Sequence, residues 1–360
     1  MKKTVSILLF LTVSFPVLAD PLFQNDSILI SSNSTLFEYS PNGELMTELP
    51  IPTNASNEVA RDITVLEDGR LAVFNGTFYP ELSVYDGSSW QSYLVDGWST
   101  PNNGSYGGIT SIGNVVFVTD GYTGSSGEAK GLIAINLEDG ESHRFIDTGD
   151  YIDITLGKDS LFYALKNTYG AVDVIDPTTL EVIRSVDLGH SSDSRGVTAN
   201  ADGMIYMVSW QGYVGHYDVA GVLLNTLYIG SNLQDIDMDS NGNIIVGDRL
   251  GRVYLTHETL STFDGIQITN SNTFVSFASP VTTPEPPVLS GSHRRRGRNI
   301  QTTLSWSTDA SGIDVYFNGQ FVESISGKNT AVYTHFKKLS QVFVVCNAGT
   351  TDCSEEYVAN

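Results

Sequence analysis

Asp62-Ile63-Thr64-Val65 decides the fold, because related stretches recur along the chain. The later copies are Gly108-Ile109-Thr110, Asp153-Ile154-Thr155, Gly196-Val197-Thr198, Asp235-Ile236-Asp237 and Asn272-Thr273-Phe274. Measured between positions 63, 109, 154, 197, 236 and 274, the spacings are 46, 45, 43, 39 and 38 residues. A drifting period of about 40 residues suits four short strands with their turns, which is the size of one β-propeller blade.

Each repeat also contains the other strands of a blade. An apolar second strand follows the first, as in Leu71-Ala72-Val73-Phe74 and Val115-Val116-Phe117-Val118. Such runs are typical of strands buried on both faces between neighbouring sheets. Asp68-Gly69 and Asn241-Gly242 mark tight turns, because glycine adopts the positive φ that these turns require.

The two ends of the repeat array complement each other. Only one strand fits between Phe274 and a proline-rich stretch, whereas the N-terminal part supplies strands near 28–30, 36–39 and 45–47 without a first strand of its own. Joining them would pair edges that an open array leaves exposed to aggregation. We therefore predict an all-β fold, a six-bladed β-propeller closed by the N- and C-terminal strands, with seven blades as the alternative.

The chain divides into four predicted segments. Residues 1–19 carry Lys2, Lys3, an apolar core and Ala19 before Asp20, the pattern of a cleaved secretory signal peptide. The propeller would occupy residues 20–279, a proline-rich linker 280–287, and a small β-sandwich 288–360. After the signal, no apolar run reaches the roughly 20 residues of a transmembrane helix, so we expect a secreted or periplasmic protein.

Two cysteines are present, Cys346 and Cys353, on either side of a short hairpin. In an oxidising compartment such a pair is expected to form a disulfide. A metal site would need further ligands nearby, and the local sequence offers none.

Two resemblances follow from these residues. The stretch from Asp237 to Asp248, Asp-Met-Asp-Ser-Asn-Gly-Asn-Ile-Ile-Val-Gly-Asp, resembles the NHL and streptogramin-lyase-like six-bladed propellers. The strand around Trp306 and the cysteine hairpin look like a divergent fibronectin type III domain of the kind appended to secreted bacterial proteins. Such propellers include lyases, lactonases and binding platforms, so the resemblance implies a fold and leaves the function open.

Charge is distributed unevenly. Residues 20–283 contain 10 Lys and Arg against 34 Asp and Glu, whereas residues 284–360 contain 7 of each. This acidity argues against nucleic acid as a partner, because phosphate binding needs a cationic surface. The basic run from His293 to Arg298 is interpreted as a solvated loop between the first two sandwich strands, with docking to an anionic surface or protease cleavage as alternatives.

Binding residues are expected on one side of the propeller. We call it the long-loop face, the side that receives the connections between second and third strands and between consecutive repeats. The candidate residues near the axis are Arg61, Asp62, Tyr106, Tyr151, Asp153, Arg195 and Asp235, and the candidates in the loops are Trp98, Tyr122 and Trp210. Arginine beside carboxylates could hold a zwitterionic or hydroxyl-bearing ligand while tyrosines stack on it, or these groups could only pair with one another across a water-filled channel.

No catalytic motif is apparent. His190 is the one histidine that we retain as a possible acid or base, and it lacks an identified partner. The stretch beginning at Asp235 imitates a calcium loop, but Ser240 and Val246 replace the required glycine and glutamate, so no metal or cofactor is expected. We therefore predict an exported, non-catalytic recognition protein that binds a small molecule, glycan or protein. The alternatives are a lyase or hydrolase acting at the axis, and an envelope scaffold protein.

Overall fold

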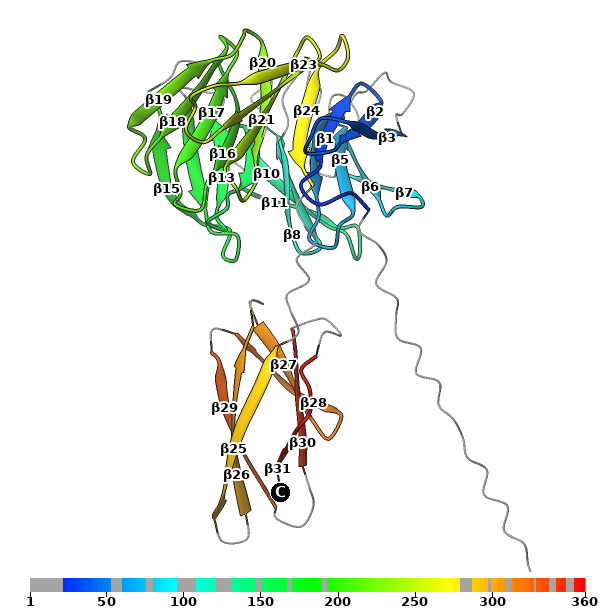
Figure 1. Cartoon of the computed structure of the whole chain (residues 1–360), viewed down its shortest axis with the longest axis vertical. Helices are drawn as coiled ribbons and strands as arrows, with labels where there is room; N and C mark the ends of the chain where they lie inside the picture. Colours follow the sequence, from blue (N-terminus) through cyan, green and yellow to red (C-terminus); the bar gives the residue numbers. More distant parts are fainter. Residues whose placement is uncertain are drawn as a thin grey trace, which may run out of the picture. The chain divides into compact units, whose positions relative to one another are not determined.

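The structure is a computed structural model of the chain (Figure 1). It describes residues 22–52, 60–75, 80–95, 108–120, 131–146, 150–166, 170–189, 193–278, 287–296, 299–308, 312–326, 328–336, 341–347 and 353–359. The predicted signal peptide and residues 280–286 of the predicted linker lie outside this set. The chain forms two compact units, Met1–Val281 and Thr282–Asn360.

The described residues are all β, and none of them forms a helix. Accordingly, they include no helix with the length and apolar character required to cross a membrane.

Among the described residues of the first unit, the strands form six four-stranded antiparallel sheets, as a β-propeller requires. Sheet 1 is β24 (Thr273–Phe277), β1 (Ile28–Ser32), β2 (Thr35–Tyr39) and β3 (Leu45–Pro50). Sheet 2 is β4 (Ala60–Val65), β5 (Leu71–Asn75), β6 (Glu81–Tyr85) and β7 (Trp90–Leu94). Sheet 3 is β8 (Ile109–Ile112), β9 (Val115–Asp120), β10 (Gly131–Asn136) and β11 (Ser142–Ile146).

The remaining sheets of this unit follow the same order. Sheet 4 is β12 (Tyr151–Leu156), β13 (Phe162–Lys166), β14 (Ala171–Ile175) and β15 (Val182–Asp187). Sheet 5 is β16 (Ser194–Ala199), β17 (Ile205–Ser209), β18 (Tyr213–Tyr217) and β19 (Leu223–Tyr228). Sheet 6 is β20 (Leu233–Met238), β21 (Asn243–Asp248), β22 (Arg252–His257) and β23 (Asp264–Gln267).

Sheet 1 combines strands from far apart in the sequence. β24 pairs with β1, so that Val275 lies opposite Ile30 and Phe277 opposite Ile28. The first strands of the sheets also contact one another in turn, β4 with β8, β8 with β12, β12 with β16, β16 with β20, β20 with β24, and β24 with β4. The six first strands therefore surround a common axis.

The core lies between the sheets. A cluster of buried apolar side chains joins every two consecutive sheets of this unit, including sheets 6 and 1. Phe74 of sheet 2 and Val116 of sheet 3, for example, are fully buried in one such cluster. Each large apolar side chain buried in this way contributes roughly 1.5–3 kcal/mol. Burial on both faces explains why a second strand such as β5 is apolar from Leu71 to Phe74.

The last repeat is aligned one residue away from the predicted position. We expected Phe274 to correspond to Ile63, but the hydrogen bonds identify Val275 instead. The N–H of Val275 donates to an aspartate of the preceding sheet, as do the N–H groups of Ile109 and Val197. A one-residue shift reverses which side chains face each neighbouring sheet. The pattern Asn272-Thr273-Phe274 was too weak to fix this register.

Four first strands begin with a β-bulge. The register shifts between Ala60 and Asp62, between Tyr151 and Asp153, between Ser194 and Gly196, and between Leu233 and Asp235. A bulge adds one residue and redirects the side chains beside it. All four bulges lie at the start of a first strand, at the end nearer the long-loop face.

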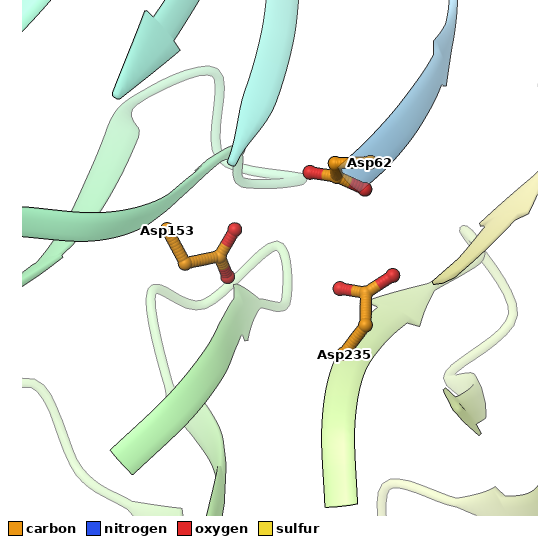
Figure 2. A group of neighbouring side chains, drawn as sticks. All are labelled: Asp62, Asp153 and Asp235. Atoms are coloured by element: carbon orange, nitrogen blue, oxygen red, sulfur yellow. The ribbon is translucent and has the colours of Figure 1, made fainter. Parts of the chain in front are cut away.

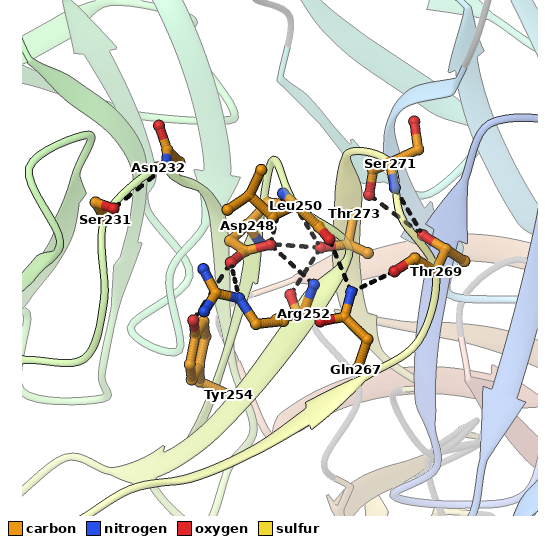
Figure 3. A network of polar contacts seen from close by, with 10 residues as sticks. All are labelled: Ser231, Asn232, Asp248, Leu250, Arg252, Tyr254, Gln267, Thr269, Ser271 and Thr273. Atoms are coloured by element: carbon orange, nitrogen blue, oxygen red, sulfur yellow. Dashed lines mark hydrogen bonds and ion pairs between the residues drawn. The ribbon is translucent and has the colours of Figure 1, made fainter.

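A polar network braces the long-loop face where sheet 6 meets sheet 1 (Figure 3). The fully buried Asp248 carboxylate accepts the N–H groups of Leu250 and Arg252, both at 2.8 Å, and the Arg252 guanidinium at 2.7 Å. The Thr273 hydroxyl, at the start of β24, accepts the Asp248 N–H at 2.9 Å. The turn between β21 and β22 is thereby fixed to the strand that completes sheet 1.

The second unit contains two sheets among its described residues. Sheet 7 is β25 (Val288–Arg296), β26 (Asn299–Ser307) and β29 (Thr330–Phe336), and sheet 8 is β28 (Gln320–Ser326), β27 (Gly312–Phe317), β30 (Gln341–Asn347) and β31 (Tyr357–Ala359). Leu304 and Trp306 of sheet 7 share a buried cluster with Val315 and Phe343 of sheet 8. The disulfide prediction is confirmed, because Cys346 and Cys353 are bonded.

The basic run was wrongly interpreted as a loop. His293 to Arg296 belong to β25, and the strand pairs with β26 as far as Arg296 opposite Asn299. Residues 297–298 of the run lie outside the described set. The run of arginines obscured the strand, because its pattern lacks the apolar alternation by which we recognised the others.

Candidate functional site

Three aspartates from alternate sheets meet at the axis (Figure 2). They are Asp62 of β4, Asp153 of β12 and Asp235 of β20. One carboxylate oxygen from each lies within 4.8 Å of the others, and all three residues are buried. They occupy equivalent places, each directly after the bulge of its strand. We call this cluster the axial trio.

Each carboxylate of the trio also bridges to the next sheet. Asp62 accepts the N–H of Ile109 at 2.8 Å, Asp153 that of Val197 at 2.7 Å, and Asp235 that of Val275 at 2.6 Å. Asp62 and Asp235 additionally accept the N–H of the residue that follows them, in each case at 2.7 Å. These bonds hold the carboxylates in fixed orientations and connect sheets 2 and 3, 4 and 5, and 6 and 1.

Glycine occupies the equivalent position in two of the intervening sheets. A Cβ added at Gly108 would collide with the Asp153 carboxylate and with the backbone of Asp153 and Ile154. At Gly196 a Cβ would lie 3.1 Å from the Ile236 nitrogen and 3.2 Å from the Asp235 Cα. In sheets 3 and 5 glycine is therefore favoured sterically, because the neighbouring sheet occupies the space that a side chain would need. In sheet 1 the equivalent residue is Phe274, which directly precedes Val275.

Burial and mutual repulsion shift the acidity of the trio. Burial, followed by the charges of Asp235 and Asp153, holds the pKa of Asp62 well above its usual range. Burial, followed by the charge of Asp153, does the same to the pKa of Asp235. Burial raises the pKa of Asp153 to about 7, although hydrogen bonds from the Val197 and Ile154 N–H groups oppose this rise.

Three full negative charges are therefore costly at the axis. Two charges at this separation repel each other by roughly 3 kcal/mol at an effective dielectric constant of about 20. The cluster can relieve the repulsion by keeping protons or by accepting a positively charged group. Three carboxylate oxygens are also the donor type that hard cations such as Ca²⁺ and Mg²⁺ prefer. We had expected no metal, and the trio is the set of described residues that could hold one.

Tyr151 and Arg61 are placed differently from the trio. The Tyr151 ring is buried in the cluster between sheets 3 and 4, and its hydroxyl donates to Asp173 at 2.6 Å. Asp173 also accepts the Lys166 ammonium at 2.7 Å. The Tyr151 side chain therefore belongs to a buried network within sheet 4. Arg61 is the buried extra residue in the bulge of β4, directly before Asp62.

Arg195 and Trp210 contact each other on the long-loop face. The Arg195 guanidinium carbon lies 5.0 Å from the centre of the Trp210 ring, and that of Arg249 lies 5.5 Å from it. Hydrogen bonds hold the backbone of Trp210 in place, since its N–H donates to the Asp193 carbonyl and its carbonyl accepts the Asn232 N–H. Cation–π contacts of this kind contribute roughly 0.5–2 kcal/mol. Arg249 was not among our sequence candidates.

Four predicted residues, Tyr106, Trp98, Tyr122 and His190, lie outside the described residues.

Another histidine of the first unit, His216 of β18, is described. Its ring stacks on that of Tyr206, with ring centroids 4.5 Å apart.

Sequence reasoning identified the three aspartates individually but missed their arrangement. The signal was present, because the same repeat position reads Asp62, Gly108, Asp153, Gly196 and Asp235. Alternation between an acid and glycine at these five positions indicates that the three aspartates occupy equivalent places and that the two glycines leave room for the aspartate-bearing strands beside them.

The chain shows weak likeness to three solved structures. No family model matches the chain, and no curated protein matches it. Virginiamycin B lyase from Staphylococcus aureus has a TM-score of 0.46 at 14% identity, over 75% of this chain and 84% of that one. Apo AztD from Citrobacter koseri gives 0.43 at 10% identity, over 70% and 98%.

A third likeness is the extracellular domain of the putative one component system BT4673 from B. thetaiotaomicron. Its TM-score is 0.44 at 13% identity, over 93% of this chain and 54% of that one. At these scores the likenesses carry no argument about what this chain binds or catalyses.

Proposed function

We propose that the first unit is a six-bladed β-propeller, closed by β24 and β1, that serves as the recognition module of an exported protein. The ring of first strands and the cluster between sheets 6 and 1 support the closure. The sequence of residues 1–19 and the Cys346–Cys353 disulfide support export, because disulfides persist in oxidising compartments. The second unit, a fibronectin type III-like sandwich in this proposal, would act as a spacer or a second contact.

The axial trio favours binding of a ligand that carries a positively charged group or several N–H and O–H donors. The observation that carries the proposal is the convergence of three buried carboxylate oxygens within 4.8 Å. A cationic group placed among them would remove the repulsion that contributes to their raised pKa values. The carboxylates would not need to reorient to bind it, because backbone N–H groups already hold them in place. An anionic ligand would be repelled by the same carboxylates.

A thermal-shift titration of the secreted chain tests this function. The probes are a primary amine, a guanidinium compound, CaCl₂ and MgCl₂, with a neutral sugar and a carboxylic acid for comparison. A ligand that binds only the native state raises its melting temperature in proportion to the logarithm of its concentration. We expect at least one cationic probe to do so at pH of about 8, and D62N or D235N to abolish the shift.

The matched control is Asp202→Asn, which removes an exposed carboxylate from a turn. Two results would overturn the assignment of the axial trio. One is a rise in melting temperature with the carboxylic acid but with none of the cations, and the other is an equal cation-induced rise in D62N and D202N.

Asp153 also supports a second candidate, a lyase or hydrolase that acts at the axis. A carboxyl group with a pKa of about 7 is suited to general acid–base catalysis near neutral pH. This candidate predicts turnover of a lactone or ester substrate with a bell-shaped pH profile that D153N removes. Binding of a cationic probe without turnover would favour the recognition function.

A further inference from the structure

The basic strand β25 lies at the edge of sheet 7 and carries the cationic part of the second unit. Sheet 7 has the order β25-β26-β29, so β25 has a paired neighbour on one side only. His293, Arg294 and Arg295 are all exposed. No residue of the three strands of sheet 7 is acidic, whereas the first unit has a large excess of acids.

Arg294 is held in place without being neutralised. Its Nε and Nη2 groups donate to the side-chain oxygen of Gln301 at 3.1 and 3.0 Å. An amide carries no charge, so this contact orients the guanidinium while leaving its positive charge available. Among the described residues, neither Arg294 nor Arg295 forms a salt bridge. Arginine presented in this way suits two-point contacts with sulfate, phosphate or carboxylate groups.

The two arginines point to opposite sides of the sheet. Arg294 pairs with Gln301, which lies on the outer side, whereas Arg295 pairs with the fully buried Ile300, which lies on the side that faces the core. Residues paired across two strands share a face. Cations on both sides of one edge strand can be contacted together by a flexible chain that wraps around the edge, but a flat membrane surface would reach one side only.

We propose that β25 is a binding site for an anionic polysaccharide, a glycan chain that carries sulfate or carboxylate groups. This second site lies on the second unit and does not depend on the function proposed for the axial trio. The surplus of acids makes the first unit an unfavourable surface for such a polymer, whereas the basic strand attracts it.

Dextran sulfate and uncharged dextran of equal length provide a matched pair of probes. Binding of the secreted chain is measured by calorimetry from about 50 to about 200 mM NaCl. We expect dextran sulfate to bind, dextran not to bind, and the affinity to fall as salt rises because counterions are released. The variants R294Q and R295Q should each weaken binding by about fivefold or more and lower the log–log salt slope by about one unit.

Lys328→Gln is the control, because it removes one exposed positive charge near the opposite end of sheet 7, just before β29. It should change the affinity by less than about twofold. The melting temperature of each variant verifies that it folds.

Equal binding of dextran sulfate by wild type, R294Q and R295Q would overturn the proposal, as would binding of dextran and dextran sulfate with the same affinity. Binding to phosphatidylglycerol vesicles without binding to dextran sulfate would assign the strand to a membrane surface and would also overturn it.

Discussion

The carboxyl group of Asp153 makes the stability of the protein depend on pH near neutrality. Its pKa rises from 3.8 to about 7 because of burial, so the folded chain binds more protons than the unfolded chain between these values. The free energy of unfolding therefore falls as pH rises through this window. Asp62 and Asp235 have raised pKa values as well and act in the same direction.

Replacing Asp153 with asparagine removes one of the three titrating groups. We expect the melting temperature of D153N, relative to wild type, to increase as pH rises from about 5 to about 8 in EDTA. The lost hydrogen bond lowers stability at every pH, so the slope of the difference is the informative quantity. D202N should give a flat difference, and a negative slope for D153N would contradict the raised pKa.

The glycines beside the trio should tolerate alanine to different degrees. Gly108→Ala forces a methyl group into the Asp153 carboxylate and backbone, whereas Gly196→Ala makes contacts of 3.1 Å and longer. Overpacking of this kind costs about 1–3 kcal/mol, so we expect G108A near or above the upper value and G196A near the lower one. Urea unfolding monitored by tryptophan fluorescence measures both costs. Equal losses would show that the Gly108 backbone can move away.

At the scale of elements, β24 has two roles. It pairs with β1, and the N–H of its central residue, Val275, donates to Asp235. Proline at this position removes the donor and leaves a buried carboxylate with one bond fewer. Val275→Pro should therefore lower the free energy of unfolding by about 3 kcal/mol or more.

Val288→Pro is the matched control for this substitution. Val288 is the first residue of the edge strand β25 and is 69% exposed, a position where proline is tolerated. A comparable loss for the two variants in chemical denaturation would contradict the importance of the Val275 N–H.

At the scale of the whole molecule, the two units differ in what stabilises them. The first unit relies on apolar clusters between its sheets. The described residues of the smaller second unit form one cluster, and a disulfide in this unit closes a loop with a sequence separation of 7. A bond across so short a loop contributes roughly 2–3 kcal/mol in the chain-entropy description.

Removing the disulfide should therefore affect one unit only. We expect differential scanning calorimetry of the C346A/C353A double variant to show one transition at lower temperature and another that is unchanged. A shift of both transitions would mean that the units unfold together.

The repeat pattern predicted the second strands and the sharing of sheet 1 between both ends of the chain, because burial on both faces requires continuous apolar runs. The same reasoning missed β25 and β28, whose described side chains are largely exposed, and β31, which has only three residues and is therefore too short to show a pattern. It also placed Tyr151 near the axis, whereas its hydroxyl is directed to Asp173. Sequence position identifies the strand that carries a residue, but a bulge and a buried partner decide where its side chain points.

The bridges from Asp62, Asp153 and Asp235 link the six sheets two by two, so the ring can be viewed as three double modules. A lineage that duplicated or lost a single sheet would leave one carboxylate without its backbone donor, or place two acids side by side. Growth or shrinkage of this architecture should therefore proceed in steps of two sheets, and relatives of different size should keep an even number.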